Sequence, residues 1–390
     1  MKQIYLDNAA TTQVDDQVAK AMIPYFTKKF GNASSLHAKG EEARNDLEKA
    51  RETIAKAINA EAKEIIFTGS GTEANNLALK GLFWYNQKQK IGKNHIITTR
   101  IEHDCIIQTC KWLKTQGVEI TYLDVDSEGF VDLKQLENSI TEKTFLVSII
   151  HGNNEIGTIQ DLSAITKICK KKNVLFHIDA CQSFTKVPID VKKQEINLMT
   201  INAHKIHGSK GVGALYLQED LKRKIIPLLH GGGQEFGLRS STENISGIMG
   251  FAKAVEVSKK SDVQTMKKLR DYFIKELLKI TNTSLNGATG DKRLCNNINL
   301  SFQNIEGESI RGLLSLNGIL VSTGSACSSH SLDPSHVLMA LGKSVLVANS
   351  SIRISLSKYT TKQEINQALI QIKKTVEKLR KISPLVKQNV

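Results

Sequence analysis

Lys205 stands where an amine could do chemistry, directly after an apolar run. The residues before it, 196–201, read INLMTI, and those after it, 212–217, read VGALYL. Short apolar runs bounded by glycine and polar turns predict buried strands. A lysine at the end of such a strand is costly unless it is paired, exposed or used covalently. Taken alone, this window also fits an ordinary surface-loop lysine.

Two other apolar runs end in groups that would complement such a lysine. Ser70 and Glu73 match the capping box of a helix start, and exposed amides at such an end bind phosphate, although this motif alone favours an ordinary capped helix. Asp179 needs a cationic partner, such as a protonated ring nitrogen, unless it caps a helix or turn. A phosphate cradle, a carboxylate for a pyridinium and a lysine for a Schiff base together point to pyridoxal 5′-phosphate.

The elements that must position these residues alternate along the first two-thirds of the chain. Helix-like stretches, such as 161–173, separate apolar runs that read as strands, and this alternation predicts a largely parallel, helix-covered sheet. Ligands of such sheets bind at the carboxyl ends of the strands. The predicted strands are 64–70, 94–99, 119–125, 144–150, 174–180, 198–202 and 213–217, and five of them lead into polar clusters at 68–73, 102–104, 151–155, 179–182 and 204–205.

Beyond about residue 260 the pattern changes. A charged helical run at 261–280 precedes strand-like segments at 296–302 and 351–357, and a closing helix is expected near 361–381. This pattern predicts a smaller α+β domain.

Composition excludes several classes of protein. The chain has 390 residues, 40% hydrophobic and 24% charged, with a formal net charge of +14. Its basic runs are short and mixed with acids, and only 5% of residues are aromatic, so no stable nucleic-acid partner is expected. The N-terminus lacks an apolar leader, and no apolar run approaches membrane-spanning length. We expect a soluble cytoplasmic protein with no membrane partner.

The six cysteines include no C-x-x-C pair, and neither a disulfide framework nor a metal site is expected. Five are expected to be small buried hydrophobes: Cys105, Cys110, Cys169, Cys181 and Cys295. Cys327 differs because it lies in a stretch of small residues, Gly324–His330, with little to pack. It is either a free thiol in a loop or a nucleophile.

Together, these residues resemble the cysteine desulfurases, which are fold-type I pyridoxal-phosphate enzymes. The resemblance runs over nearly the whole chain and is carried by motifs that occur in order. They are YLDNAATT at 5–12, FGNASSLH at 30–37, TEANNLALKG at 72–81, HGNNEIGTIQ at 151–160, HIDACQS at 177–183, AHKIHGSKGVGALY at 203–216, GGGQEFGLRSSTENI at 231–245, STGSACSS at 322–329 and SSIRISLS at 350–357.

The resemblance implies an α/β fold with a mainly parallel seven-stranded sheet covered by helices, and a smaller α+β domain. We place the large cofactor-binding domain at 15–260. The small domain, formed by 1–14 and 261–390, would carry the loop with the catalytic cysteine.

The resemblance also implies a role for each site residue. Lys205 would carry pyridoxal 5′-phosphate, Asp179 would pair with its ring nitrogen, and His103 would stack on the ring and move protons. Cys327 would be the nucleophile that accepts sulfur. The remaining contacts are Gln182 to the phenolic oxygen; Gly71, Thr72, Asn202 and His204 to the phosphate; Thr242 to the phosphate of the other subunit of a homodimer; and Asn154 and Arg353 to the substrate carboxylate.

The implied activity converts L-cysteine to L-alanine and leaves the sulfur on the enzyme as a persulfide. The stretch TGSACSS followed by LDPSHVLMALG resembles the long-loop subgroup, which supplies iron–sulfur cluster assembly and transfer-RNA thiolation. The partner would be a sulfur-acceptor protein, either an iron–sulfur scaffold or a thiolation enzyme, and Cys327 could transiently bind a cluster held by that partner. The chain departs from the family pattern at Asn202, Ser209 and Cys181, and its C-terminal segment is short, which puts docking of the scaffold in doubt.

Two rival activities remain at this level. Selenocysteine lyase or aminotransferase chemistry uses the same fold, although an aminotransferase would not need Cys327. A catalytically idle, basic RNA or protein adaptor that kept the fold is the alternative of a different class, and it need not bind the cofactor.

Overall fold

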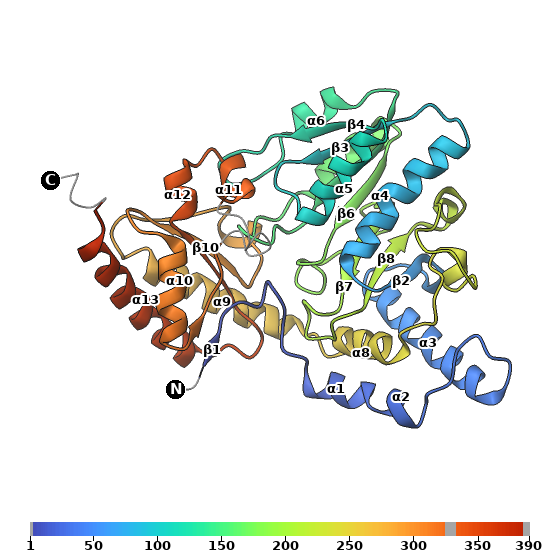
Figure 1. The fold of residues 1–390 in the computed structure, drawn as a ribbon, viewed down its shortest axis with the longest axis horizontal. Helices are drawn as coiled ribbons and strands as arrows, with labels where there is room; N and C mark the ends of the chain where they lie inside the picture. Colours follow the sequence, from blue (N-terminus) through green and yellow to red (C-terminus); the bar gives the residue numbers. More distant parts are fainter. Residues whose placement is uncertain (1–2, 324–332, 385–390) are drawn as a thin grey trace.

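The computed structural model describes residues 3–323 and 333–384. Its main feature is a seven-stranded sheet in the order β2-β8-β7-β6-β5-β3-β4 (Figure 1). Six of these strands run parallel, and β8 alone is antiparallel to both of its neighbours. The strands are β2 Ile65–Thr68, β3 His95–Thr99, β4 Glu119–Leu123, β5 Thr144–Ile150, β6 Leu175–Asp179, β7 Leu198–Asn202 and β8 Gly213–Leu217. The predicted sheet is therefore confirmed.

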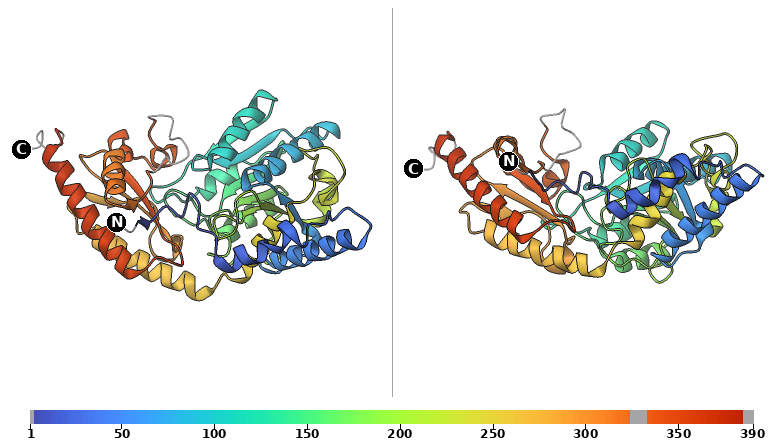
Figure 2. Two further views of the ribbon diagram at one scale, coloured as in Figure 1. Left: turned by 60° about the horizontal axis from the view of Figure 1, so that its bottom comes forward. Right: turned by 90° about the horizontal axis from the view of Figure 1, so that it is seen from below.

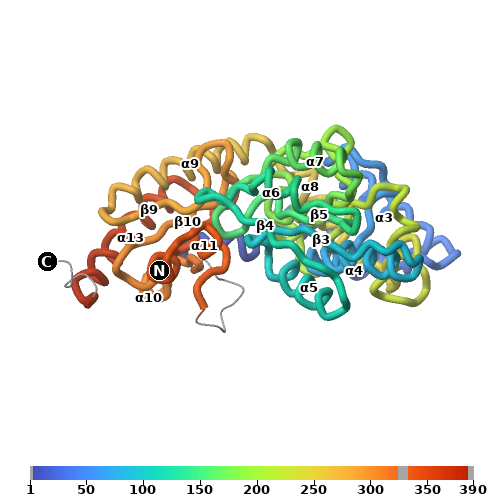
Figure 3. Tube along the Cα trace, turned by 90° about the horizontal axis from the view of Figure 1, so that it is seen from above, coloured from blue at the N-terminus to red at the C-terminus, as the bar shows by residue number. Residues whose placement is uncertain are grey.

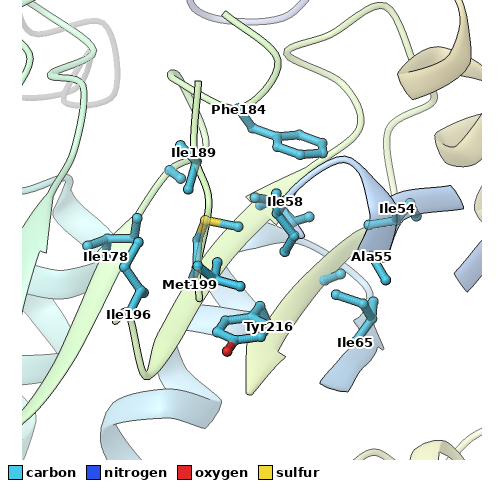
Figure 4. Packing of buried hydrophobic residues seen from close by; sticks show 14 of the residues in the cluster. Ile54, Ala55, Ile58, Ile65, Ile178, Phe184, Ile189, Ile196, Met199 and Tyr216 are labelled. Carbon is cyan, nitrogen blue, oxygen red and sulfur yellow. The ribbon is translucent and has the colours of Figure 1, made fainter. Parts of the chain in front are cut away.

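Helices cover both faces of this sheet because the strand side chains alternate between two apolar cores. Ile66 packs into the core beneath α4 and α5, whereas Ile65 and Phe67 pack into the opposite core. Figure 4 shows Ile58 near Met199 of β7 and Tyr216 of β8, with Ile54 and Ala55 of α3 further to the side, all in that opposite core. The covering helices are α1 Asp16–Met22, α2 Pro24–Thr27, α3 Ala38–Lys56, α4 Gly71–Lys88, α5 Asp104–Thr115, α6 Leu133–Ser139, α7 Leu162–Lys171 and α8 Ile245–Glu256.

A second group of elements lies beside the sheet and has its own apolar core (Figure 2). It contains the antiparallel sheet β12-β10-β9 and the short parallel pair β1-β11, which joins the N-terminal segment to the C-terminal third of the chain. Its elements are β1 Ile4–Tyr5, α9 Lys260–Leu277, β9 Thr283–Leu285, β10 Asn297–Phe302, α10 Gly307–Leu316, β11 Ile319–Leu320, α11 His336–Ala340, α12 Val345–Asn349, β12 Ser351–Ser355 and α13 Lys362–Ile382. The domain boundaries at 14/15 and 260/261 stay a prediction, which this separate core favours.

The tube view shows α9 running along the side of both groups, with α13 beside it at the outer end (Figure 3). Within the described ranges, no helix is long and apolar enough to cross a membrane. The expected cytoplasmic location stays a prediction.

Candidate active site

The polar clusters predicted at the strand ends meet in one pocket at the carboxyl edge of the sheet. The pocket encloses about 930 Å³, open solvent included. Ten of the twelve predicted site residues line it: Gly71, Thr72, His103, Asn154, Asp179, Gln182, Asn202, His204, Lys205 and Arg353. Of the other two, Cys327 lies outside the described residues, and Thr242 is exposed and does not line the pocket of this chain.

Lys205 follows β7, and its amine reaches across the pocket to the N-terminal segment. Its Nζ donates to the backbone carbonyl oxygens of Ala9 and Ala10, the latter at 2.6 Å. The side-chain amide of Gln182 donates to the same Ala9 oxygen at 2.8 Å. The segment around Ala9 therefore forms a wall of the pocket and holds the amine at its edge.

The N-terminus of α4 lies opposite and is closely packed. The Ser70 hydroxyl caps the helix by accepting the N–H of Glu73 at 3.1 Å, whereas the Glu73 carboxylate accepts the N–H of Gly69 and not that of Ser70. The predicted helix start is confirmed, with a shifted partner for Glu73. A Cβ on Gly71 would lie 2.6 Å from Cys181 Sγ, so only glycine allows this approach. The helix thus presents its positive end to the pocket.

Asn202 and His204 face this helix end from β7. A Cβ on Gly71 would lie 3.3 Å from the Asn202 Nδ2 atom, which places that amide nitrogen at the helix start. The His204 imidazole lies 3.2 Å from Thr11 Oγ1. Burial and the amines of Lys205, Lys210 and Lys186 lower the pKa of His204 to about 4, so its ring is neutral at physiological pH. If Nδ1 of this neutral ring accepts a hydrogen bond from the Thr11 hydroxyl, Nε2 carries the ring proton and can donate a hydrogen bond.

Asp179 is the last residue of β6 and is buried at the pocket floor. Its Oδ1 accepts the N–H of Cys181 at 2.9 Å, and its Oδ2 accepts Asn75 Nδ2 at 2.8 Å. Burial and the neighbouring Asp179 carboxylate raise the pKa of the Cys181 thiol well above its usual range. That thiol is therefore neutral and able to donate.

His103 is the N-cap of α5. Its Nδ1 accepts the N–H of Cys105 at 3.2 Å, so the neutral ring carries its proton on Nε2. The preceding Glu102 is fully buried, and burial raises the pKa of its carboxyl to about 8. The Ile150 N–H donates to that carboxyl at 2.9 Å. His103 is thus fixed by its own bond to the start of α5 and by the bond between the preceding Glu102 and Ile150 of β5.

Arg353 enters the pocket from β12, which belongs to the group of elements beside the main sheet. Its Nη2 pairs with Asp7 at 2.9 Å, and its Nη1 donates to the Asn154 carbonyl oxygen at 3.2 Å. The guanidinium is only 2% exposed. Its Nε has no partner among the residues the structure describes.

Three amide oxygens around the pocket also lack a hydrogen-bond partner among the described residues. Within the described part of the chain, the buried Oδ1 atoms of Asn75, Asn154 and Asn202 accept no hydrogen bond. Buried polar atoms are rarely left unpaired, and amide groups can present either nitrogen or oxygen after a flip. The pocket therefore fits a polar ligand that would complete these contacts.

Sequence reasoning missed three features of the pocket. Asn75 lies one turn after Gly71 on the same face of α4, and that spacing could have revealed it. The wall at Ala9 and Ala10 could not be recognised from residue types, because its contacts with Lys205 and Gln182 are made by backbone carbonyl oxygens. Cys105 and Cys181 were expected to be buried hydrophobes, which is wrong: both are half-buried and line the pocket, whereas Cys110, Cys169 and Cys295 are buried as expected. These two thiols line the pocket because α5 begins there, just before Cys105, and β6 ends there, just before Cys181.

The segment that leads into α11 is tied to two pocket loops. The Ser335 hydroxyl donates to the Glu155 carboxylate at 2.5 Å, and the His336 Nε2 bonds the Glu102 carbonyl oxygen at 2.9 Å. Glu155 follows Asn154, and Glu102 precedes His103. Residues 335–336 therefore lie against the pocket rim.

The segment 231–244 is structured through a buried ion pair. Glu235 accepts Arg51 Nη1 and Nη2 at 2.7 and 2.8 Å and also the Phe67 N–H at 2.7 Å. This anchors the segment to β2 and α3 and leaves Thr242 exposed beyond it.

Comparison with known proteins identifies what this architecture is similar to. The family model described as "Aminotransferase class-V" matches residues 4–368. The chain is 48% identical over 388 residues to the cysteine desulfurase IscS of Dictyoglomus turgidum, covering 98% of this chain and 97% of that protein. A solved NifS-like protein matches with a TM-score of 0.89 and 41% identity, covering 97% of this chain and 100% of that one. The structure titled SspA in complex with cysteine matches with a TM-score of 0.81 and 37% identity over 92% of this chain and 99% of that one.

Proposed function

Because the chain belongs to the class-V aminotransferase family and, within it, to the cysteine desulfurases, we propose that its pocket binds pyridoxal 5′-phosphate at Lys205 and releases sulfur from L-cysteine. The observation that carries this proposal is the meeting of Lys205, Asp179 and the α4 N-terminus in one pocket with unpaired buried polar atoms. The experiment that tests it is an assay for alanine formed from L-cysteine by the purified protein, with and without added cofactor.

The residues present fit this cofactor at both of its polar ends. The α4 N-terminus at Gly71 and Thr72, with the Asn202 amide and the neutral His204 ring, would bind the phosphate. Thr242 of a second subunit would complete that site. When bound, the cofactor would supply a positively charged ring that stabilises negative charge at the substrate Cα.

The chain's own residues would orient the ring. Asp179 would pair with the ring nitrogen, because the Cys181 N–H and the Asn75 amide hold its carboxylate in place at the pocket. The Gln182 amide would contact the phenolic oxygen, and His103 would stack on the ring face. Lys205 Nζ would carry the cofactor and, once released, would take the proton from the substrate Cα.

Arg353 and Asn154 would orient the substrate carboxylate. The unpaired Arg353 Nε and the unsatisfied Asn154 amide lie in the same pocket, and a guanidinium fork matches a carboxylate. The Asp7 contact holds the guanidinium plane in place before the substrate arrives.

Replacing Arg353 with lysine keeps the charge but removes the fork. Since hydrogen bonds to charged groups are worth about 1.5–3 kcal/mol, we expect the KM for L-cysteine to rise by about tenfold to a hundredfold, with a smaller change in kcat. Steady-state kinetics measures both. Arg293→Lys is the matched control, because Arg293 is equally buried but bonds carbonyls outside the pocket. Equal KM values in Arg353→Lys and the unmodified enzyme would remove Arg353 from the substrate site.

Cys327 would accept the sulfur. Its thiolate would form an S–S bond with the substrate sulfur, the Cβ–S bond would break, and a proton delivered to Cβ would complete alanine. The described chain resumes at Asp333 and is tied to the pocket rim at Ser335 and His336. Eight residues can span up to about 28 Å, a length that would allow Cys327 to reach the pocket. A sulfur-acceptor protein for iron–sulfur cluster assembly or transfer-RNA thiolation would then take the sulfur.

A homodimer is supported by an exposed apolar surface on the N-terminal segment. Four large side chains within residues 23–36 are strongly exposed: Ile23 at 59%, Phe26 at 62%, Phe30 at 69% and Leu36 at 93%. Exposed apolar surface of this kind marks an interface. The exposed Thr242 would reach the partner's pocket from the anchored segment 231–244.

We expect the double variant Phe26→Ser, Leu36→Ser to dissociate into monomers and to bind the cofactor more weakly, because each pocket would lose the partner's Thr242. Sedimentation velocity measures the mass. Thr242→Ala is the matched control, which should weaken cofactor binding but stay dimeric. An unmodified enzyme that is a fully active monomer would contradict the proposed dimer.

A further inference from the structure

Asn75 is a buried amide that the proposed mechanism does not use. It lies in the second turn of α4 and has no exposed surface. Its Nδ2 donates to Asp179 Oδ2 at 2.8 Å and to Cys105 Sγ at 3.1 Å. An asparagine inside a helix is unfavourable unless its side chain finds partners, and here those partners are pocket residues.

The two N–H groups that donate to Asp179 come from different segments and bind different carboxylate oxygens. The Cys181 N–H binds Oδ1, and the Asn75 amide binds Oδ2. Each carboxylate oxygen therefore accepts at least one protein N–H, and the Cys181 thiol is a further hydrogen-bond partner of this carboxylate. Donors to the charged form of a buried carboxylate favour that form, and two donors also fix its rotation.

One helix therefore serves both polar ends of the pocket. The α4 N-terminus at Gly71 lies close to the Asn202 amide, and Asn75, one turn further along, donates a hydrogen bond to Asp179. A rigid helix holds these two points at a constant separation.

We propose that Asn75 is a positioning residue: together with the Cys181 N–H it fixes the rotation of the Asp179 carboxylate toward the pocket, and so sets how strongly, and over what pH range, the ring nitrogen of a bound cofactor is held. This inference rests on the proposed function, because it assigns Asp179 to that nitrogen. In this role Asn75 acts on the ring nitrogen through Asp179.

Other ionisable groups face Asp179 and must stay constant in any test. From the elements packed around it come Glu102 and His103 after β3, Cys105 of α5, His177 of β6, Cys181 after β6, and His204 and Lys205 after β7, with Arg353 of β12 across the pocket. Glu102 is coupled to Asp179, because the Asp179 charge adds to burial in raising the pKa of the Glu102 carboxyl to about 8. A substitution at Asn75 removes a contact from one of them, the Cys105 thiol, which also accepts the Asn75 amide at 3.1 Å.

The test measures binding of pyridoxal 5′-phosphate to the cofactor-free dimer between pH 5 and pH 8.5, by equilibrium dialysis. Asn75→Ala removes one donor from the charged carboxylate. We expect affinity at neutral pH to fall by roughly tenfold and the acidic limb of the affinity profile to move to higher pH by about one unit. Asn75→Asp places a second carboxylate against Asp179, so the pair must share a proton, and the limb should move further.

Asn76→Ala is the matched control. Asn76 is the same residue type on the same helix, but its amide bonds the Thr72 carbonyl oxygen and accepts the Thr109 hydroxyl. It should lose comparable stability and leave the acidic limb where it is in the unmodified protein. Thermal unfolding of all variants separates a folding defect from a binding defect.

The outcomes separate the two claims. If the unmodified protein fails to take up the cofactor at every pH, the proposed function is wrong. If it takes up the cofactor and Asn75→Ala shows the same acidic limb as the unmodified protein, Asn75 is a structural residue only and the inference is overturned. A limb that moves equally in Asn76→Ala would overturn it as well.

Discussion

Replacing Lys205 with alanine will abolish the formation of alanine from L-cysteine and prevent covalent attachment of the cofactor. Turnover should fall by at least about a thousandfold, because the variant loses the attachment point and the proton acceptor together. The substitution lies at a pocket edge, and the amine's two hydrogen bonds are to carbonyl oxygens of Ala9 and Ala10. Unfolding should therefore become easier by only about 1–2 kcal/mol.

Lys186→Ala is the matched control. Lys186 also donates to two backbone carbonyl oxygens, those of Gln182 and Lys205, but it does not line the pocket. It should lose similar stability and still attach the cofactor. Normal alanine production by Lys205→Ala, measured by amino-acid analysis, would refute the assignment of the cofactor to Lys205.

Replacing Cys327 with serine will separate cofactor chemistry from sulfur transfer. The described residues that line the pocket come from other segments, so the variant should bind the cofactor and change its absorbance when cysteine is added. A serine hydroxyl is a far weaker nucleophile toward sulfur at neutral pH, because little alkoxide exists. Persulfide and alanine should both fall by at least about a hundredfold.

The structure sharpens the controls for this variant. Cys105 and Cys181 line the same pocket, so they are the rival thiols. Burial raises the pKa of Cys181 well above its usual range, which disfavours its thiolate. Cys105→Ser and Cys181→Ser should each keep persulfide formation. Undiminished protein-bound sulfur in Cys327→Ser, located by mass spectrometry on Cys105 or Cys181, would show that the nucleophile is a pocket thiol.

Much of the fold and site follows from the sequence because parallel strands end at one edge of a sheet. Asp179 and Asn202 end neighbouring parallel strands, so the sequence alone places both residues at the same edge of the sheet, before the helices are considered. The direction of β8 did not follow, because GALYL has the apolar pattern of its neighbours and nothing local sets its polarity. The partners of Asn75 and the carbonyl wall at Ala9 depend on packing between distant segments, which residue types alone do not reveal.

The site also shows where a residue's surroundings override its type. Cysteine is usually a small buried hydrophobe, yet Cys105 follows the cap of α5 and Cys181 follows the end of β6, so both thiols face the pocket. Glu235 lies in a glycine-rich stretch that resembles a loop, yet it is buried against Arg51. In both cases the determining contacts join segments far apart in the chain.

The most direct test of the central claim is to identify the lysine that carries the cofactor. The purified protein, loaded with pyridoxal 5′-phosphate, would be reduced with borohydride to fix the linkage and then mapped by peptide mass spectrometry. The cofactor should be found on Lys205 alone, among all the lysines of the chain. Its appearance on Lys186, the neighbouring amine whose pKa burial lowers to about 8, would contradict the assignment to Lys205, as would a protein that retains no cofactor.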